Sequence, residues 1–279
     1  MPSVRTREQT WQHPACGQIA YRLWEPSHPT HTLIMVHGFG EHSGRYGLLA
    51  KAFAEQGIFV VCPDLVGHGR STGRRGDIDR FDRYVDVLDA WATAGLGVIA
   101  GGHARAMVFG HSLGGLVTIH WALRCPTRFE RLILQAPLLE VGFPVPPWKT
   151  RLAEWLTRYW PSLLLPAGLD PTWLSHDPTI VQAYREDPLV SRRISLRCYE
   201  AIQTAMRQAM ERASQLKPPT LMLYGMEDRV VSVSACRTFF EQISCEKRLM
   251  EFPGCRHELH HEPAFPQVVE AVLRWIGVA

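Results

Sequence analysis

A serine between two glycines is the residue of this chain best suited to nucleophilic chemistry. Residues 110–114 read Gly-His-Ser-Leu-Gly, the pattern G-x-S-x-G, with Ser112 at the centre. A short apolar run at residues 106–109 precedes the pattern, and a longer apolar run at residues 116–123 follows it. A strand, a sharp turn and a helix in this order present a serine hydroxyl on a strained turn, where flanking glycines avoid clashes. The sequence therefore predicts Ser112 as a nucleophile, and the alternative is an ordinary glycine-rich turn.

A serine hydroxyl is a weak nucleophile at neutral pH, so it needs a base and a carboxylate that orients the base. The expected order along the chain is serine, acid, histidine. Asp228 follows the apolar run of residues 220–224 by a few positions, and Glu227 is the neighbouring alternative. We expect Asp228 to be the carboxylate.

The base should lie on a loop after the last strand. His257 follows the apolar run of residues 248–252 and a Pro-Gly turn. His260 and His261 are alternatives, but they lie closer to the start of the final helix. We expect His257 to take the proton of the serine hydroxyl.

The same stretch matches a metal-binding pattern. Residues 257–261 read His-Glu-Leu-His-His, which fits the H-E-x-x-H pattern of zinc proteases. That chemistry needs both histidines on one continuous helix, and the prolines at positions 253 and 263 leave little room for one. No third-ligand pattern follows, so we expect neither a metal nor an organic cofactor.

Attack on a carbonyl creates an oxyanion, which needs preorganised N–H donors. The backbone N–H of Leu113, directly after the nucleophile, should be one donor. The second should come from residues 37–40, which read His-Gly-Phe-Gly and follow an apolar run at residues 32–36. The backbone N–H of Phe39 is the expected second donor.

The elements that must position these groups alternate between strand-like and helix-like patterns. Alternation at short intervals predicts a parallel sheet that is covered on both faces. The expected strands lie at residues 32–36, 58–62, 106–109, 132–134, 220–224 and 248–252, with an edge hairpin or strand at 16–24. The expected helices lie at residues 46–56, 81–94, 116–123 and 265–276, with a further helix around Phe239 and Phe240.

The alternation stops between residues 137 and 218, where the sequence is helix-like and has no strand-like run. We therefore expect one core domain, residues 1–136 and 219–279, interrupted by a helical insertion at residues 137–218. Five apolar side chains of this insertion fall on one helical stripe: Leu152, Trp155, Leu156, Tyr159 and Trp160.

Bulk properties narrow the class of protein. The 279 residues carry a formal net charge of +3 and no basic run, which gives no indication of nucleic-acid binding. The seven cysteines are scattered without a C-x-x-C pair, as is typical of a reducing compartment. The first residues form no apolar signal segment, and no run of about 18 apolar residues exists, so we expect a cytoplasmic protein without a membrane span.

These motifs resemble those of the monoacylglycerol lipase and lysophospholipase-like α/β-hydrolases. Residues 37–46, HGFGEHSGRY, resemble the family's oxyanion-loop motif, which is specific to the family. Residues 64–71, 110–115, 225–228 and 256–257 are similar to its other motifs, and the similarity runs from about residue 10 to the C-terminus. The resemblance implies the α/β-hydrolase fold, with a mostly parallel eight-stranded sheet flanked by helices and an inserted helical cap.

The resemblance also implies a function, namely a serine hydrolase acting on monoacylglycerols and related single-chain lipid esters. It implies that Glu41 and Arg45 help to bind the glycerol end of the substrate. The alternative for both is a loop salt bridge that shapes the oxyanion turn. The large apolar residues of the insertion either pack it onto the core or form an acyl tunnel, with a rim that touches a membrane or micelle transiently.

Other functions are open on the same fold. A lysophospholipase, a general carboxylesterase, an acyltransferase, a peptide- or lactone-cleaving enzyme and a cofactor-free perhydrolase would use the same residues. Epoxide hydrolysis and dehalogenation are disfavoured because they use a carboxylate nucleophile, whereas this turn carries Ser112. A binding protein without catalysis should have lost part of the machinery, all of which is present here.

Overall fold

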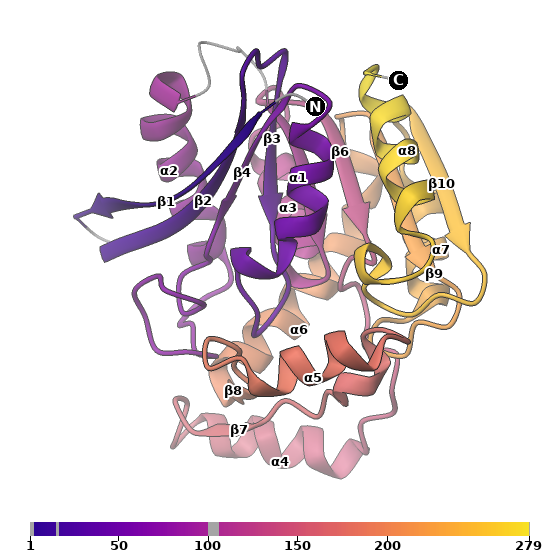
Figure 1. The fold of residues 1–279 in the computed structure, drawn as a ribbon. Helices are drawn as coiled ribbons and strands as arrows, with labels where there is room; N and C mark the ends of the chain where they lie inside the picture. The colour runs from indigo at the N-terminus through magenta and orange to yellow at the C-terminus, as the bar shows by residue number, and fades with distance from the viewer. Residues whose placement is uncertain (1–2, 15–16, 100–105, 279) are drawn as a thin grey trace.

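Eight strands of the chain form one sheet in the computed structural model, which describes residues 3–14, 17–99 and 106–278. The strand order is β1-β2-β4-β3-β5-β6-β9-β10 (Figure 1). The β1–β2 and β2–β4 pairs are antiparallel, and the remaining pairs are parallel. The predicted α/β-hydrolase fold with a mostly parallel eight-stranded sheet is confirmed. The strands are β1 (Val4–His13), β2 (Gly17–Pro26), β3 (His31–Val36), β4 (Ile58–Pro63), β5 (Ala106–His111), β6 (Phe129–Gln135), β9 (Thr220–Gly225) and β10 (Lys247–Phe252).

The central strands are apolar throughout because helices cover both faces of the sheet. Every residue of β4, β5 and β9 is buried, which is the pattern of a parallel sheet packed on two sides. Helices α1 (Gly47–Ala54) and α8 (Phe265–Ile276) pack on one face. Helices α2 (Asp82–Ile99), α3 (Leu113–Arg124) and α7 (Val233–Gln242) pack on the other face (Figure 1).

Most expected elements lie within a few residues of their predicted bounds. Helix α8 has the predicted bounds. Helix α1 is shorter than the predicted residues 46–56, since it begins after a 3₁₀ turn at Ser43–Tyr46 and ends at Ala54. Strand β1, the antiparallel partner of β2, was not predicted. The edge element expected at residues 16–24 corresponds to β2 alone. Cys16, the first residue expected in it, lies outside the described residues, and the six described cysteines are all free thiols.

The segment between β6 and β9 lies at the end of the sheet where the parallel strands terminate (Figure 1). It contains α4 (Pro147–Thr157), α5 (Pro178–Glu186) and α6 (Leu196–Glu211), with 3₁₀ turns at Pro171–Trp173 and Ala213–Gln215. It also contains two short antiparallel strands, β7 (Leu164–Pro166) and β8 (Arg193–Ser195), where the sequence led us to expect none. Three residues are too few for an alternating pattern to be visible. We keep residues 137–218 as the proposed extent of this cap.

The apolar stripe begins in α4 and continues past its end at Thr157, and four of its five side chains face solvent rather than the core. Trp155 and Trp160 are 52% and 57% exposed, and Leu152 and Tyr159 are exposed as well. The cap is instead packed through α6, which buries Cys198, Ile202, Ala205, Met206 and Ala209. For these four side chains, the alternative that large apolar groups pack the cap onto the core is therefore wrong.

Candidate active site

Ser112 lies on a sharp turn between β5 and α3, as the motif predicts. Its backbone has φ of 53° and ψ of −119°, a conformation that L-residues rarely adopt. The turn also brings the start of α3 close to the neighbouring strand, because a Cβ atom on Gly114 would lie 2.0 Å from the carbonyl oxygen of Val36. Only glycine fits there, which explains the second glycine of the motif.

Asp228 and His257 are joined by a short hydrogen bond. The Nδ1 atom of His257 lies 2.7 Å from Oδ2 of Asp228, and both side chains are almost completely buried. The other carboxylate oxygen, Oδ1, accepts the backbone N–H groups of Val230 and Val231 at 2.8 and 3.0 Å. Since Nδ1 donates to Asp228, the neutral imidazole carries its lone pair on Nε2, the atom a general base uses.

The surroundings of His257 favour its protonated form. Burial alone would lower the pKa of His257, but the charge of Asp228 and the hydrogen bond to it outweigh burial. Glu258 and Glu41 act in the same direction, so the pKa lies above its ordinary value of 6.5.

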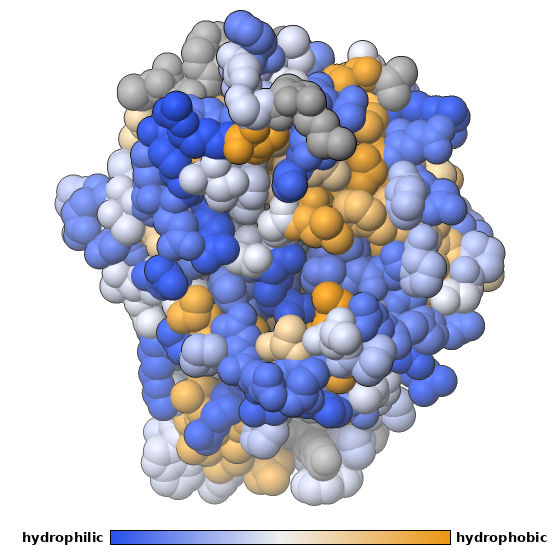
Figure 2. All heavy atoms as spheres, in the orientation of Figure 1, coloured by the Kyte–Doolittle hydropathy of each residue, from blue (hydrophilic) through white to orange (hydrophobic). Residues whose placement is uncertain are grey.

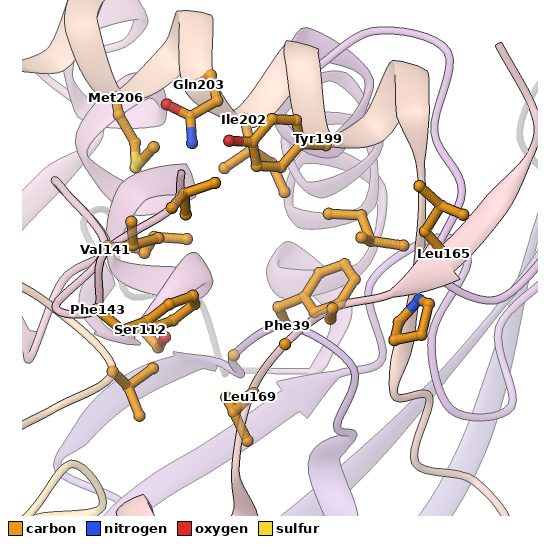
Figure 3. A pocket seen from close by; sticks show the side chains of 18 of the residues that line it. Phe39, Ser112, Val141, Phe143, Leu165, Leu169, Tyr199, Ile202, Gln203 and Met206 are labelled. Carbon is orange, nitrogen blue, oxygen red and sulfur yellow. The ribbon is translucent and has the colours of Figure 1, made fainter. Parts of the chain in front are cut away.

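Ser112 and His257 line one cavity, together with Gly38 and Phe39 of the loop after β3. Figure 3 shows Ser112 and Phe39 at this cavity. The loop lies directly against the serine, because a Cβ atom on Gly38 would be 3.2 Å from that of Ser112. Leu113, the other expected donor residue, is the first residue of α3, where backbone N–H groups have no partner within the helix.

The alternative residues lie elsewhere. Glu227 is exposed and lies 3.6 Å from Nε2 of His176. His260 is buried against Tyr46, with ring centroids 5.0 Å apart. The Nδ1 atom of His261 lies 2.6 Å from Oε2 of Glu258. None of the three alternatives lines the cavity of Ser112.

Glu41 and Arg45 belong to a buried ion network. Oε1 of Glu41 accepts the Gly38 N–H at 2.6 Å and the Tyr46 hydroxyl at 2.7 Å. Arg45 donates to Oε2 of Glu41 at 3.1 Å and to both oxygens of Glu258 at 2.8 and 2.7 Å. This geometry corresponds to the loop salt bridge. Glu41 and Glu258 also reach the cavity, whereas Arg45 is not among its described lining residues.

The H-E-x-x-H stretch does not form the helix that zinc chemistry needs. Only Leu259–His261 is helical, as a single 3₁₀ turn, and His257 is bound to Asp228. Ligand atoms of Glu258, His260 and His261 come within 4.8 Å of one another, but both oxygens of Glu258 already bind Arg45. These contacts satisfy Glu258 with a cation of the chain itself.

The cavity is polar at the serine and apolar beyond it. Its volume is about 460 Å³, and its walls come from the loop after β6 and from the cap (Figure 3). Tyr199 and Gln203 add two polar side chains from α6. Leu165 is one of the large apolar residues of the insertion that were expected either to pack on the core or to form an acyl tunnel. The wall residues of α6 were not singled out, although the amphipathic pattern of this helix was a usable signal. The apolar walls include Leu138, Val141, Phe143, Leu165, Leu169, Leu174, Ile202 and Met206.

Comparison with known proteins gives matches over nearly the whole chain. A family described as "Serine aminopeptidase, S33" matches residues 27–264. The chain is 29% identical to a monoacylglycerol lipase of Mycolicibacterium smegmatis, covering 93% of this chain and 92% of that protein. It is 32% identical to the monoglyceride lipase of Homo sapiens, covering 95% and 87%. It also matches 27% of the length of a larger abhydrolase domain-containing protein of Dictyostelium discoideum.

A solved structure agrees with these matches. The monoacylglycerol lipase of Paleococcus ferrophilus superposes with a TM-score of 0.82 at 30% identity, covering 99% of this chain and all of that one.

Proposed function

The chain belongs to the serine aminopeptidase S33 family and is a serine ester hydrolase, and from this premise we propose that it cleaves monoacylglycerols to fatty acid and glycerol. The cavity is the observation that carries the proposal. One continuous space joins a polar end at Ser112 and His257 to apolar walls that suit a single acyl chain. Several relatives of the chain bear the name of this activity.

In the proposed mechanism Ser112 attacks the ester carbonyl while His257 takes its proton through Nε2. Asp228 keeps the imidazole in this tautomer and stabilises its cation. The backbone N–H groups of Phe39 and Leu113 hold the developing oxyanion. His257 then protonates the leaving glycerol, and a water activated by His257 releases the fatty acid from Ser112.

The charge at the polar end favours glycerol over a phosphate head group. Burial opposes ionisation of Glu258, but Arg45 and His261 hold its pKa well below the ordinary value. The pKa of Glu41 is also lowered. Burial alone would raise it, and the charge of Arg45 acts in the opposite direction. Two carboxylates around one guanidinium leave an excess of negative charge, which accepts hydrogen bonds from hydroxyl groups and repels an anion. A lysophospholipid is therefore the second candidate.

The cap carries a surface suited to contact with the lipid phase that supplies the substrate. We call this surface the apolar rim, and Figure 2 shows pale and orange atoms at the lower end, over α4 and β7. Exposed groups of this size on one surface are typical of sites that bind a membrane or another protein. No helix in the described parts of the chain is long and apolar enough to cross a membrane. The apolar rim consists of Trp148, Leu152, Trp155, Tyr159, Trp160, Leu163 and Leu165.

A comparison of turnover tests the proposed substrate. Purified enzyme would be given a monoacylglycerol, a lysophosphatidylcholine, a triacylglycerol and a short p-nitrophenyl ester, each with the same acyl chain where possible. We expect the highest kcat/KM on the monoacylglycerol, with Ser112→Ala as the blank. A preference for the lysophospholipid or the triacylglycerol would contradict the proposed substrate while leaving the ester hydrolase activity in place.

A further inference from the structure

A segment of the cap runs alongside the loop that carries His257, and we call it the docking segment (residues 172–176). The backbone N–H of Glu258 donates to the carbonyl oxygen of Leu174 at 2.9 Å, and that of His257 points to Trp173 at 3.5 Å. In the other direction, the Ser175 hydroxyl donates to the carbonyl oxygen of His261 at 2.7 Å. The cap thus supplies partners for the main chain of the base itself.

Glu262 holds the docking segment and the histidine loop together. Its carboxylate is completely buried. Oε1 accepts the backbone N–H of His176 at 2.7 Å, while Oε2 lies 2.7 Å from Nδ1 of the same residue. Oε2 also accepts the backbone N–H of Arg256, the residue before His257, at 3.2 Å. One carboxylate therefore joins two segments that are distant in the sequence, since His176 and Glu262 are 86 positions apart.

The side chain of Arg256 also contacts the docking segment. Its Nη1 atom donates to the carbonyl oxygens of Thr172 and Ser175 at 2.7 and 3.0 Å. The histidine loop also contacts the acid loop, which carries Asp228. There the backbone N–H of Glu227 donates to the carbonyl oxygen of Cys255 at 2.9 Å. The histidine loop consequently lies between the acid loop and the cap.

We propose that the docking segment is a fixed part of the catalytic apparatus and that Glu262 is the positioning residue that sets the place of His257. The proposal rests on the role of His257 given under the proposed function. Glu262 does not line the cavity, so it acts through the loop and not on the substrate. Without its carboxylate, the two donors of His176 and the backbone N–H of Arg256, all partly buried, lose their acceptor, and the loop loses its side-chain link to His176.

Kinetics of Glu262→Ala and Glu262→Gln test this role. We expect kcat of Glu262→Ala to fall about tenfold or more, because small displacements of a catalytic group cost this much or more in rate. KM should change by less than about twofold, since Glu262 does not line the cavity and Leu174 is the one residue of the docking segment that does. Glu262→Gln should retain more activity because the amide oxygen keeps one acceptor. The acid limb of the pH profile should move to lower pH in both variants as His257 loses its alignment with Asp228.

The matched control removes a different contact between cap and core. Nη1 of Arg74, an exposed side chain, donates to the carbonyl oxygen of Ser162 at 2.8 Å, away from the histidine loop. Arg74→Ala should therefore keep the wild-type kcat. If Glu262→Ala does not fold, His176→Ala replaces it, because His176 is 39% exposed and its removal spares the buried carboxylate. This variant should lose about threefold in kcat, less than the full displacement of the base would cost.

Two results would overturn the proposal. One is a lower melting temperature of Glu262→Ala with unchanged kcat per titrated active site at a temperature where the variant is folded. The other is an equal loss in Arg74→Ala, which would mean that any loosening of the cap has this effect. All these variants are assayed on a p-nitrophenyl ester. If the monoacylglycerol proposal failed, the wild-type enzyme would cleave this ester but not monoacylglycerol, and the comparison of the variants with the wild type would still hold.

Discussion

Asp228 binds His257 through one carboxylate oxygen and two backbone N–H groups through the other, so its carboxylate cannot turn away from the imidazole. The aspartate is itself held by the first residues of the turn that follows it. This arrangement fixes both the tautomer of His257 and the direction in which Nε2 points.

The pKa of His257 predicts how activity depends on pH. The base must be neutral, and its pKa lies above 6.5 because the charge of Asp228 outweighs burial. Activity should therefore fall as pH drops through this raised pKa, at a higher pH than for a free imidazole. The measurement is kcat/KM for a p-nitrophenyl ester between about pH 5 and 9.

Asp228→Asn should move the inflection of the pH–activity profile to lower pH, because the charge that raises the pKa of His257 is gone. It should also reduce kcat by about 10⁴-fold, since the asparagine favours the wrong tautomer. An unchanged inflection in this variant would contradict the assignment of Asp228.

Ser112→Ala should abolish ester cleavage without unfolding the protein. A loss on the order of 10⁶-fold in kcat is expected for removal of the nucleophile. The strained φ of 53° remains in the variant, so its melting temperature should stay close to that of the wild type. Labelling by a fluorophosphonate probe should vanish in parallel. Substantial remaining hydrolysis, or labelling of another residue, would refute the assignment of Ser112.

Gly114→Ala should destabilise the whole protein. The added Cβ would lie 2.0 Å from the carbonyl oxygen of Val36 and 2.5 Å from that of His37, and backbone atoms cannot give way as a flexible side chain can. We expect a loss of about 3 kcal/mol or more in the free energy of unfolding, measured by urea denaturation. Gly47→Ala is the control, since nothing lies within 4 Å of its added Cβ.

Arg45→Lys distinguishes a salt bridge from a glycerol contact. Lysine keeps the charge but loses the fork that binds Glu41 and Glu258 together. We expect kcat to fall by the same factor on a monoacylglycerol and on a p-nitrophenyl ester, which has no glycerol. A rise in KM on the monoacylglycerol alone would instead support binding of glycerol by Arg45.

Trp155 and Trp160 on the apolar rim test the proposed contact with lipid. Replacing both with serine should weaken binding to phosphatidylcholine vesicles at least about tenfold, because each exposed indole buries apolar area in the interface. Hydrolysis of a soluble short ester should not change, since neither side chain lines the cavity. Vesicle sedimentation and the esterase assay together give both readouts.

The sequence predicted the core better than the cap, for a physical reason. Strands such as β4 and β9 are short runs buried on both faces, and the motifs follow them directly, so their order and their loops were predictable. The stripe on α4 has the same periodicity as a buried helix, and periodicity alone does not say whether protein or solvent lies against it. Its exposure was therefore not predictable.

Interactions between distant loops were also beyond prediction. Nothing in the spacing of Arg45 and Glu258 indicates that they meet, because they are 213 positions apart and the turn that brings them together depends on the whole sheet. The salt bridge that joins Arg45 to Glu41 and Glu258 therefore became visible only in the coordinates. The contacts of Glu262 with the cap were likewise not predictable, because Glu262 lies just after the H-E-x-x-H pattern and belongs to no motif.

The contacts of the docking segment limit how this enzyme can be recombined with its relatives. A cap exchanged as one uninterrupted block would carry away the carbonyl groups that Glu258 and Arg256 bind. A chimera designed to alter acyl preference should therefore graft the stretches before and after residues 172–176 separately and leave these five residues native.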